Sequence, residues 1–436
     1  MSEPEQRWVP TRALGRAVLV SGLLIVIAVL LGRADLVVLA APFVLGTAVS
    51  LLRRPADPPR VRIGVERSSL AEGDEVSSAV DVASPDRAGY DLVVLRARVA
   101  SWLALRHADR PYAVAVPPGS DARVPLVGPA LRWGRHPIGP ASATAFASDA
   151  LLVSAPVTGS AVKITVYPRT EPFDADDAMP RAAGLVGAHR SRRLGEDGEL
   201  AGVRVFAPGD RLRRVDWRVS LRERQLHVAA TFSDRDAEVV LLVDVLYEAG
   251  RSGGVHGEPS VLDTTVRAAA GIAEHYLDRG DRVALLEYGL RARRLRPATG
   301  RRQYLAVLEW LLDCAPTVGA GEPSPYVFGP HLLSGNALVV VLSPLLEPRS
   351  AAMVANLARA GRFVVAVDTL PPGIRLPGWG HWGAVPARLW RLERDNVLGQ
   401  LREHGVPVVA WAGAGSLDAV LRDVARMASG PKAVPR

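Results

Sequence analysis

The segment GELAGVRVFAPGDRLRRVDWRVSLRERQLHV, residues 198–228, carries the most information in this 436-residue chain. It is crowded with arginines, interrupted by acidic residues, and contains one Trp and a Pro-Gly-Asp sequence. Pro208, Gly209 and Asp210 predict a tight turn, because Pro fixes φ and Gly accepts a positive φ. The arginines can bind carboxylates, phosphates or carbonyls, and a guanidinium can stack on Trp217. From the residues alone, a surface hairpin held by arginine–aspartate salt bridges remains the simplest interpretation.

The same segment resembles the signature of the MoxR-associated, von Willebrand A-like family known as domain of unknown function fifty-eight. That signature reads roughly G-E-F-x-G-L-R-x-Y-x-P-G-D-D-x-R-x-I-D-W-x-x-S-A-R. The matching residues of this chain are Gly198, Glu199, Gly202, Arg204, Pro208, Gly209, Asp210, Arg213, Asp216, Trp217, Ser220 and Arg222. Phe206 and Val215 are conservative replacements, whereas Arg211 replaces an acid and Leu221 replaces Ala.

The resemblance implies a von Willebrand A-like α/β domain and a MoxR-type AAA+ ATPase as partner. Members of the family are thought to act as adaptors in the assembly or maturation of other proteins near the membrane. We therefore expect the signature to bind the partner or to order its own turn against the sheet. The candidate residues for these roles are Arg204, Pro208, Gly209, Asp210, Arg213, Asp216, Trp217, Ser220 and Arg222.

Composition narrows the class of protein. A hydrophobic content of 48% indicates a membrane segment together with well-filled cores. The single cysteine, Cys314, excludes an intramolecular disulfide and fits a reducing compartment. The net charge of +8 is carried almost entirely by arginine, since Lys163 and Lys432 are the only lysines. Because acids are interleaved with the arginines of residues 190–224, we expect intramolecular pairing there and no binding to nucleic acid.

Two apolar runs, residues 17–31 and 36–52, lie near the N-terminus. Each is slightly shorter than the roughly 20 residues of a spanning helix, and flanking residues make up the difference. A cleavable signal peptide is not expected, because the second run follows at once. Arginines precede the first run and follow the second, at positions Arg7, Arg12, Arg16, Arg53 and Arg54. The positive-inside rule predicts a transmembrane hairpin over residues 1–54 in the inner (cytoplasmic) membrane, with both termini and the soluble domains in the cytoplasm.

The sequence pattern changes several times after the hairpin. Residues 55–60 are rich in Pro and predict a stiff linker. Short apolar strands separated by turns predict a β-sandwich-like domain over residues 61–167. Residues 168–235 read as a polar connector that carries the signature. From residue 236 to 430 apolar strands alternate with helices, which predicts a doubly wound α/β domain with a parallel sheet covered on both faces. This agrees with the von Willebrand A-like domain that the resemblance implies.

A von Willebrand A domain usually binds Mg²⁺ at the carboxyl end of its sheet, through Asp, Ser and Thr side chains. Here Asp244 ends the first strand, but Leu246 and Glu248 occupy the two serine positions. Thr299 is a weak counterpart of the threonine, and Pro344 stands where relatives carry Asp. Leu and Pro supply no side-chain ligand to a hard cation. We therefore expect no cofactor, treat Asp244, Glu248 and Thr299 as a degenerate metal site, and interpret Asp244 as a carboxylate that accepts hydrogen bonds from its own loop.

The sequence contains no phosphate-binding loop and no nucleophile elbow, and its histidines are scattered, so we expect no enzymatic activity. These patterns favour a membrane-anchored cytosolic adaptor or scaffold that works with a MoxR-type AAA+ ATPase in protein assembly or maturation. Such a protein contacts the lipid bilayer and its protein partner, and neither nucleic acid nor an identified small molecule. The alternative is a metal- or ligand-binding sensor that uses the carboxyl end of the α/β sheet, around Asp244, Glu248 and Thr299.

Overall fold

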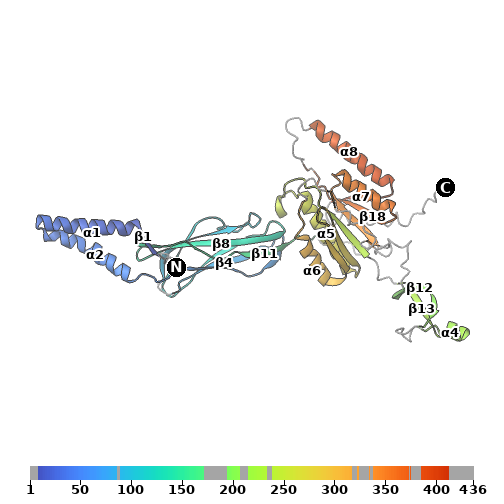
Figure 1. Ribbon diagram of the computed structural model, residues 1–436, viewed down its shortest axis with the longest axis horizontal. Coiled ribbons are helices and arrows are strands. Elements are labelled where there is room, and N and C mark those ends of the chain that lie inside the picture. The colour runs from blue at the N-terminus through green and yellow to red at the C-terminus, as the bar shows by residue number, and fades with distance from the viewer. Residues whose placement is uncertain are drawn as a thin grey trace. The chain divides into compact units, whose positions relative to one another are not determined.

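The computed structural model divides the chain into two compact units, Met1–Tyr167 and Pro168–Arg436 (Figure 1). It describes residues 8–85, 89–170, 194–206, 215–232, 238–316, 322–323, 333, 337–372, 374 and 384–411. The predicted turn at residues 208–210, the first part of the predicted connector, residues 171–193, and a helix expected near residues 417–427 lie outside these ranges.

The first unit begins with two long apolar helices, α1 (Arg12–Leu31) and α2 (Ala34–Leu52), which pack against each other (Figure 1). Gly32 joins them with a φ of 58°, which glycine adopts without a Cβ clash. Most of their large apolar side chains are exposed, Val29 to 76% and Leu52 to 86%, so neither is the core helix of a soluble domain. Both helices are long and apolar enough to cross a membrane.

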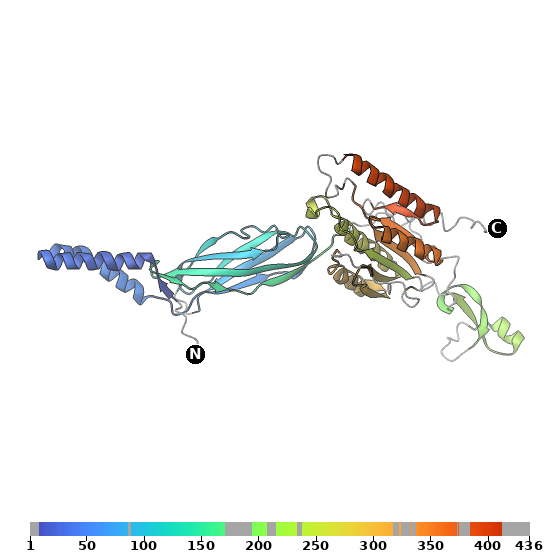
Figure 2. The ribbon, with the colours of Figure 1, turned by 45° about the horizontal axis from the view of Figure 1, so that its top comes forward.

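The rest of the first unit is a β-sandwich of the kind that the strand and turn pattern predicts (Figure 2). Its smaller sheet is antiparallel and has the order β2 (Arg60–Val65), β4 (Glu75–Ala83), β7 (Ala122–Pro129). The larger sheet is built on β8 (Gly134–Ala147) and also contains β1 (Trp8–Pro10), β3 (Ser69–Ala71), β5 (Tyr90–Val99), β6 (Tyr112–Val116), β9 (Leu152–Ser154), β10 (Val157–Thr158) and β11 (Val162–Tyr167). Alternate residues of both sheets, such as Val80, Val93 and Ile138, are fully buried in one shared core.

Both ends of the helical hairpin are tied to one turn of this sandwich. Strand β1, immediately before α1, pairs with β9, and the N–H of Thr11 donates to the carbonyl oxygen of Leu151 at 2.9 Å. In the last turn of α2, the hydroxyl of Ser50 donates to the carboxylate of Asp149. Asp149 lies in the turn of residues 148–150, whose φ angles of 58°, 55° and 61° are all left-handed. Such angles are strained for residues with a Cβ, so the surrounding contacts must hold this turn in place.

The Pro-rich segment after α2 packs on the sandwich. Pro55 and Pro59 are buried, and the carbonyl oxygen of Asp57 accepts a hydrogen bond from the hydroxyl of Tyr90 at 3.0 Å. The predicted linker therefore has two buried prolines, and burying their rings removes apolar surface from water.

The signature region of the second unit forms a small module of two strands and one helix. Strand β12 (Leu194–Val205) pairs antiparallel with β13 (His227–Phe232), and α4 (Trp217–Glu223) lies between them in the chain. Val215 bridges to Val228, and both are buried, so the segment before α4 is anchored on β13. The described part of the predicted connector is therefore an ordered element.

The remainder of the second unit is an α/β domain with a six-stranded sheet. The strand order is β16 (Arg294–Ala298), β15 (Arg282–Tyr288), β14 (Glu238–Asp244), β17 (Ala337–Ser343), β18 (Phe363–Asp368), β19 (Val408–Ala410). All neighbouring strands are parallel except β16, which runs antiparallel to β15. The central strands β14 and β17 are buried at every residue, as expected for a sheet covered on both faces.

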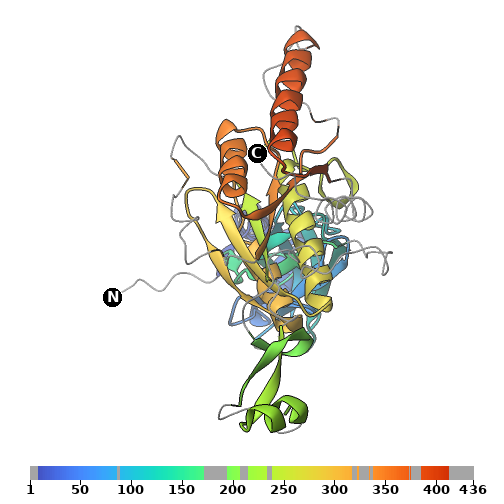
Figure 3. The same ribbon diagram turned by 90° about the vertical axis from the view of Figure 1, so that its right-hand side faces the viewer.

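Helices cover the two faces of this sheet (Figure 1, Figure 3). One face carries α5 (Val261–Asp278), which packs on β14, β15 and α6 (Gly300–Leu311). The other face packs onto α7 (Pro348–Arg359) and α8 (Ala384–Glu403), through Met353, Val354 and Leu401 among others. The predicted doubly wound arrangement is therefore present. From β14 the chain adds β15 and β16 on one side of the sheet, and then β17, β18 and β19 on the other side of β14. The topological switch point therefore lies between β14 and β17.

We predict that Gly128→Ala destabilises the sandwich by about 3 kcal/mol, because the new methyl group has no space. A Cβ at Gly128 would lie 2.1 Å from the carbonyl oxygen of Ala104, which is backbone and cannot swing away. Gly64→Ala is the matched control in the same sheet, since its Cβ would meet only an oxygen of Asp81 at 3.6 Å. Thermal unfolding of the full chain in detergent measures the difference, and equal melting of the two variants would contradict this packing.

Candidate functional site

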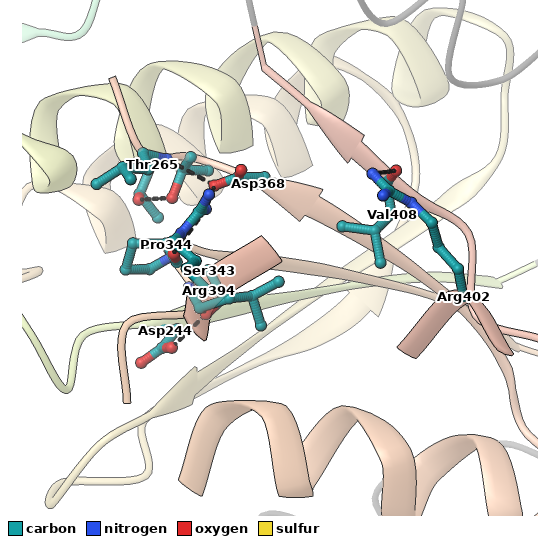
Figure 4. A network of polar contacts seen from close by, with 11 residues as sticks. Asp244, Thr265, Ser343, Pro344, Asp368, Arg394, Arg402 and Val408 are labelled. Atoms are coloured by element: carbon teal, nitrogen blue, oxygen red, sulfur yellow. Dashed lines mark hydrogen bonds and ion pairs between the residues drawn. The ribbon is translucent and has the colours of Figure 1, made fainter. Parts of the chain in front are cut away.

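The carboxylate of Asp244 lies at the topological switch point, where α/β folds place their ligands. It ends the buried strand β14 and is itself buried. Its Oδ2 accepts a hydrogen bond from the hydroxyl of Ser343 at 2.6 Å (Figure 4). It accepts a second hydrogen bond from the hydroxyl of Ser350, also at 2.6 Å. Its Oδ1 accepts from the backbone N–H of Leu246 at 3.0 Å. Both oxygens are therefore engaged by the protein, but only the Leu246 donor comes from the loop of Asp244, whereas Ser343 ends β17 and Ser350 lies on α7.

Burial raises the pKa of Asp244 above its usual range, because the charged form loses its hydration. The hydrogen bonds from the two serines and from Leu246 oppose this rise by stabilising the carboxylate. The three donors thus compensate for removing the group from water, and they fix the positions of β14, β17 and α7 at the switch point.

A second buried carboxylate, Asp368, stands at the end of the neighbouring strand β18. It forms an ion pair with Arg394 of α8 at 2.5 Å and accepts the backbone N–H of Leu370 at 3.0 Å (Figure 4). Arg394 also donates to the carbonyl oxygen of Pro344, at 3.0 Å from Nη2. Burial raises the pKa of Asp368, and the adjacent guanidinium counteracts the rise. Arg394 therefore attaches α8 to the loops that follow β17 and β18.

Two buried threonines connect this end of the sheet to α5. The hydroxyl of Thr265 donates to the carbonyl oxygen of Val261 and lies 2.8 Å from the hydroxyl of Thr369. The backbone N–H of Thr369 donates to the carbonyl oxygen of Ser343 at 3.1 Å. The carboxyl ends of β14, β17 and β18 are thus joined to helices α5, α7 and α8 by polar contacts within the protein, as Figure 4 shows for the labelled residues.

The structure does not assemble the predicted degenerate metal site. Glu248 accepts the backbone N–H of Leu262 at 3.1 Å, close to the start of α5. Thr299 directly follows β16, and Ala298 pairs with Val283 near the amino end of β15, so Thr299 lies at the opposite end of the sheet from Asp244. The grouping of Thr299 with Asp244 is therefore corrected. Its physical reason is that β16 returns antiparallel and carries the following loop away from the strand ends.

The residues that surround Asp244 were missed by the sequence analysis. Ser343 and Asp368 each stand last in a buried apolar strand, a signal that can be found in a sequence. Ser350 and Arg394 lie on helices far away in the chain, and neither belongs to a recognisable pattern. Only the folded sheet brings them to the switch point.

The signature residues fall into two groups in the described part of the chain. Asp216 caps α4, its Oδ1 accepting the N–H groups of Arg218 and Val219 at 3.1 Å each. The buried hydroxyl of Ser220 accepts the N–H of His227 at 2.8 Å and lies 3.3 Å from its carbonyl oxygen.

Two further signature residues point away from the module. Trp217 is 61% exposed, and Arg222 is exposed beside Glu223. Of the remaining candidates, only the backbone of Arg204 is described, in β12, while Pro208, Gly209, Asp210 and Arg213 lie outside the described residues.

Cys314 is a buried core residue. Burial raises the pKa of its thiol to about 12, although the guanidinium of Arg293 lies 3.2 Å from the sulfur. At neutral pH the thiol is therefore protonated, which is the unreactive form.

We predict that Arg394→Met destabilises the α/β domain by about 3–5 kcal/mol, because Asp368 is left buried without its counter-ion. Without the guanidinium the pKa of Asp368 rises further, so the folded protein binds this proton more tightly than the unfolded chain. Because the pKa of Asp368 in wild type already lies above the usual value of about 4, the deficit against wild type should grow once the pH passes that raised pKa, where wild type releases the proton and the variant keeps it.

The double variant Asp368→Asn/Arg394→Met supplies the control, since it removes both charges and should recover most of the loss. Hydrogen exchange of the β18 amides in the full chain measures the local stability. A deficit that does not change with pH would contradict a role for the carboxylate charge.

Residues 202–383 match the family model described as protein of unknown function DUF58. Relatives include the uncharacterized proteins Rv1480 of Mycobacterium tuberculosis and Mb1516 of Mycobacterium bovis, each 28% identical over 202 residues. The match covers 45% of this chain and 62% of either relative, so the chain spans less than two thirds of their length.

The solved structures that match this chain have low identity and low TM-scores. The CARDB domain of the PF1109 protein from Pyrococcus furiosus matches 25% of this chain and 92% of that one, with 12% identity and a TM-score of 0.20. The sporulation control protein Spo0M of Bacillus subtilis matches 34% and 57%, with 12% identity and a TM-score of 0.15. Likenesses at these TM-scores support no assignment. The family match covers residues 202–383, which include α4 and the strands from β14 to β18, and this part of the chain is therefore similar to the DUF58 family of unknown function.

Proposed function

We propose that this protein is a membrane-anchored adaptor that works with a MoxR-type AAA+ ATPase in the assembly or maturation of other proteins, without enzymatic activity or a cofactor of its own. The observation that carries the anchoring is the attachment of the hairpin. Strand β1 precedes α1 and β2 follows α2, and both strands belong to the same sandwich. Both ends of the hairpin therefore lie on one side of a membrane that the helices cross.

The arginines define which side this is. Arg12 and Arg16 lie in the first turns of α1, and Arg53 and Arg54 directly follow α2. Arg33 in the connection between the helices is paired with Asp35 at 2.6 Å. The excess of positive charge at the sandwich end supports a cytosolic location for the sandwich and for the domains that follow it.

The α/β domain supports an adaptor role through the state of its strand ends. An enzyme site needs polar groups that are free to meet a substrate. At the switch point of this domain, the carboxylates of Asp244 and Asp368 are occupied by serine, arginine and backbone donors of the protein itself. The strand order, with antiparallel β16 at one edge, also supports the von Willebrand A-like assignment that the signature suggested.

The test of this function is reconstitution with a purified MoxR-type ATPase from the same organism. We expect the full-length protein, held in nanodiscs of neutral lipid, to retain the ATPase, and empty nanodiscs to release it. A reporter that is active only in the cytosol, fused after Arg436, should be active in cells. Failure to retain the ATPase, or activity of a periplasmic reporter at the same position, would overturn the adaptor function or its topology respectively.

A cation-binding module is the second candidate, and one observation favours it. Ser343 and Ser350 place two hydroxyls around the carboxylate of Asp244, and these are ligand types that Mg²⁺ accepts. Binding would require the two hydroxyls to exchange their hydrogen bonds with Asp244 for the ion.

This candidate predicts that millimolar Mg²⁺ or Mn²⁺ raises the melting temperature of the wild-type chain, because a ligand of the folded state stabilises it by mass action. The double variant Ser343→Ala/Ser350→Ala should show no such increase. If the melting temperature of the wild type is the same with metal and with chelator, the cation-binding function is rejected and the adaptor function is unaffected.

A further inference from the structure

One side of helix α4 forms hydrogen bonds with its own module. Asp216 caps its first turn, and Ser220 forms hydrogen bonds with the backbone of His227 on β13. Val215 and Val228 bridge beneath it and are buried. These contacts hold the helix in one orientation on the β12–β13 pair.

The outward side of α4 presents two large apolar residues to solvent. Trp217 and Leu221 are four residues apart and therefore lie on one face of the helix. Their exposed fractions are 61% and 78%, among the highest for large apolar side chains outside α1 and α2. No described residue covers the exposed parts of these two side chains. Exposed apolar groups of this size are typical of an interaction surface.

Arginines border this apolar pair. Arg218 and Arg222 lie next to it, one helical position further round, and Arg224 follows at the C-terminal end. The only carboxylate paired with them in the described residues is Glu223, at 3.1 Å from Arg222, and this pair is exposed. Tryptophan and arginine are the residues that most often dominate binding at protein interfaces. Positive charge that has no further paired carboxylate among the described residues is complementary to a negative surface.

Arg224 supplies an independent indication. It is the C-terminal cap of α4 and has a φ of 54°, a left-handed conformation in which glycine is the usual residue. An arginine at this position costs stability, and within the described residues its side chain forms no ion pair that repays this cost. The cation is therefore more readily explained by an external anionic partner than by the fold.

We propose that the outward face of α4, formed by Trp217, Arg218, Leu221, Arg222 and Arg224, docks onto an acidic surface of the ATPase partner that has an apolar depression for Trp217 and Leu221. This inference rests on the proposed function and adds which residues make the contact and what chemistry the partner presents. A bilayer is a less suitable occupant, because α4 has only 7 residues and two apolar side chains, whereas helices that lie on membranes present a longer apolar face.

The experiment measures binding of the purified MoxR-type ATPase to the full-length protein in nanodiscs of neutral phosphatidylcholine. Trp217→Ala and Leu221→Ala should each weaken binding by at least about ten-fold, as expected for anchor residues. Arg224→Gly should leave folding intact, because glycine suits a left-handed cap, yet weaken binding, with a loss that shrinks as salt is raised. Leu305→Ala is the control, since Leu305 is an exposed leucine on helix α6.

The outcomes distinguish the docking face on α4 from the adaptor function. If the ATPase binds wild type and the α4 variants equally, the docking face is wrong and the adaptor function stands. If it does not bind wild type at all, both are overturned. Hydrogen exchange of α4 in the absence of the ATPase tests whether something else covers this face. Protection only in nanodiscs that contain phosphatidylserine would assign the face to the bilayer. Protection in neutral nanodiscs would assign it to another part of this chain. Either result overturns the proposal.

Discussion

Removing a carboxylate from water is the constraint on which the α/β domain is built. Asp244 ends a strand that is buried at every position, so its charge has no access to bulk solvent and must be met by donors of the protein. Those donors come from the following loop, from the end of β17 and from α7, and a buried ion pair at Asp368 adds α8. Each of these contacts is satisfied only when all the elements are in place. The polar network therefore specifies one arrangement of strands and helices, whereas apolar packing alone tolerates several.

The α/β domain and the signature module of the second unit differ in which side chains they bury and which they expose. At the switch point the described hydroxyls of Thr265, Ser343 and Ser350 form hydrogen bonds within the protein, with Thr369 and with Asp244. In the module of the signature, Asp216 and Ser220 also turn inward, but Trp217 and Leu221 do not. The signature segment thus contains residues that form hydrogen bonds within the module and a tryptophan that is exposed on it.

The sequence was sufficient for the features that depend on long, uniform patterns. The apolar runs of α1 and α2 and the buried strands of the α/β domain are visible because every residue, or every second one, repeats the same signal. It was insufficient where partners meet from distant positions, as for Ser350 and Arg394 on their helices. It misplaced Thr299, because the direction of β16 cannot be read from its composition. It left open whether Trp217 contacts a partner or orders a turn, since a tryptophan among arginines carries no information on which way it points, and the structure shows that it is exposed.

The attachment of the hairpin to the sandwich has a consequence for how the protein is made. Strand β1 is synthesised before both apolar helices, but its partner β9 follows about 140 residues later. In the proposed topology, the ribosome delivers both helices to the membrane before the edge of the larger sheet can close. Insertion then comes first and completion of the β-domain second, so that the sandwich assembles beside a hairpin already in place. In water, the exposed apolar side chains of the same hairpin would favour aggregation.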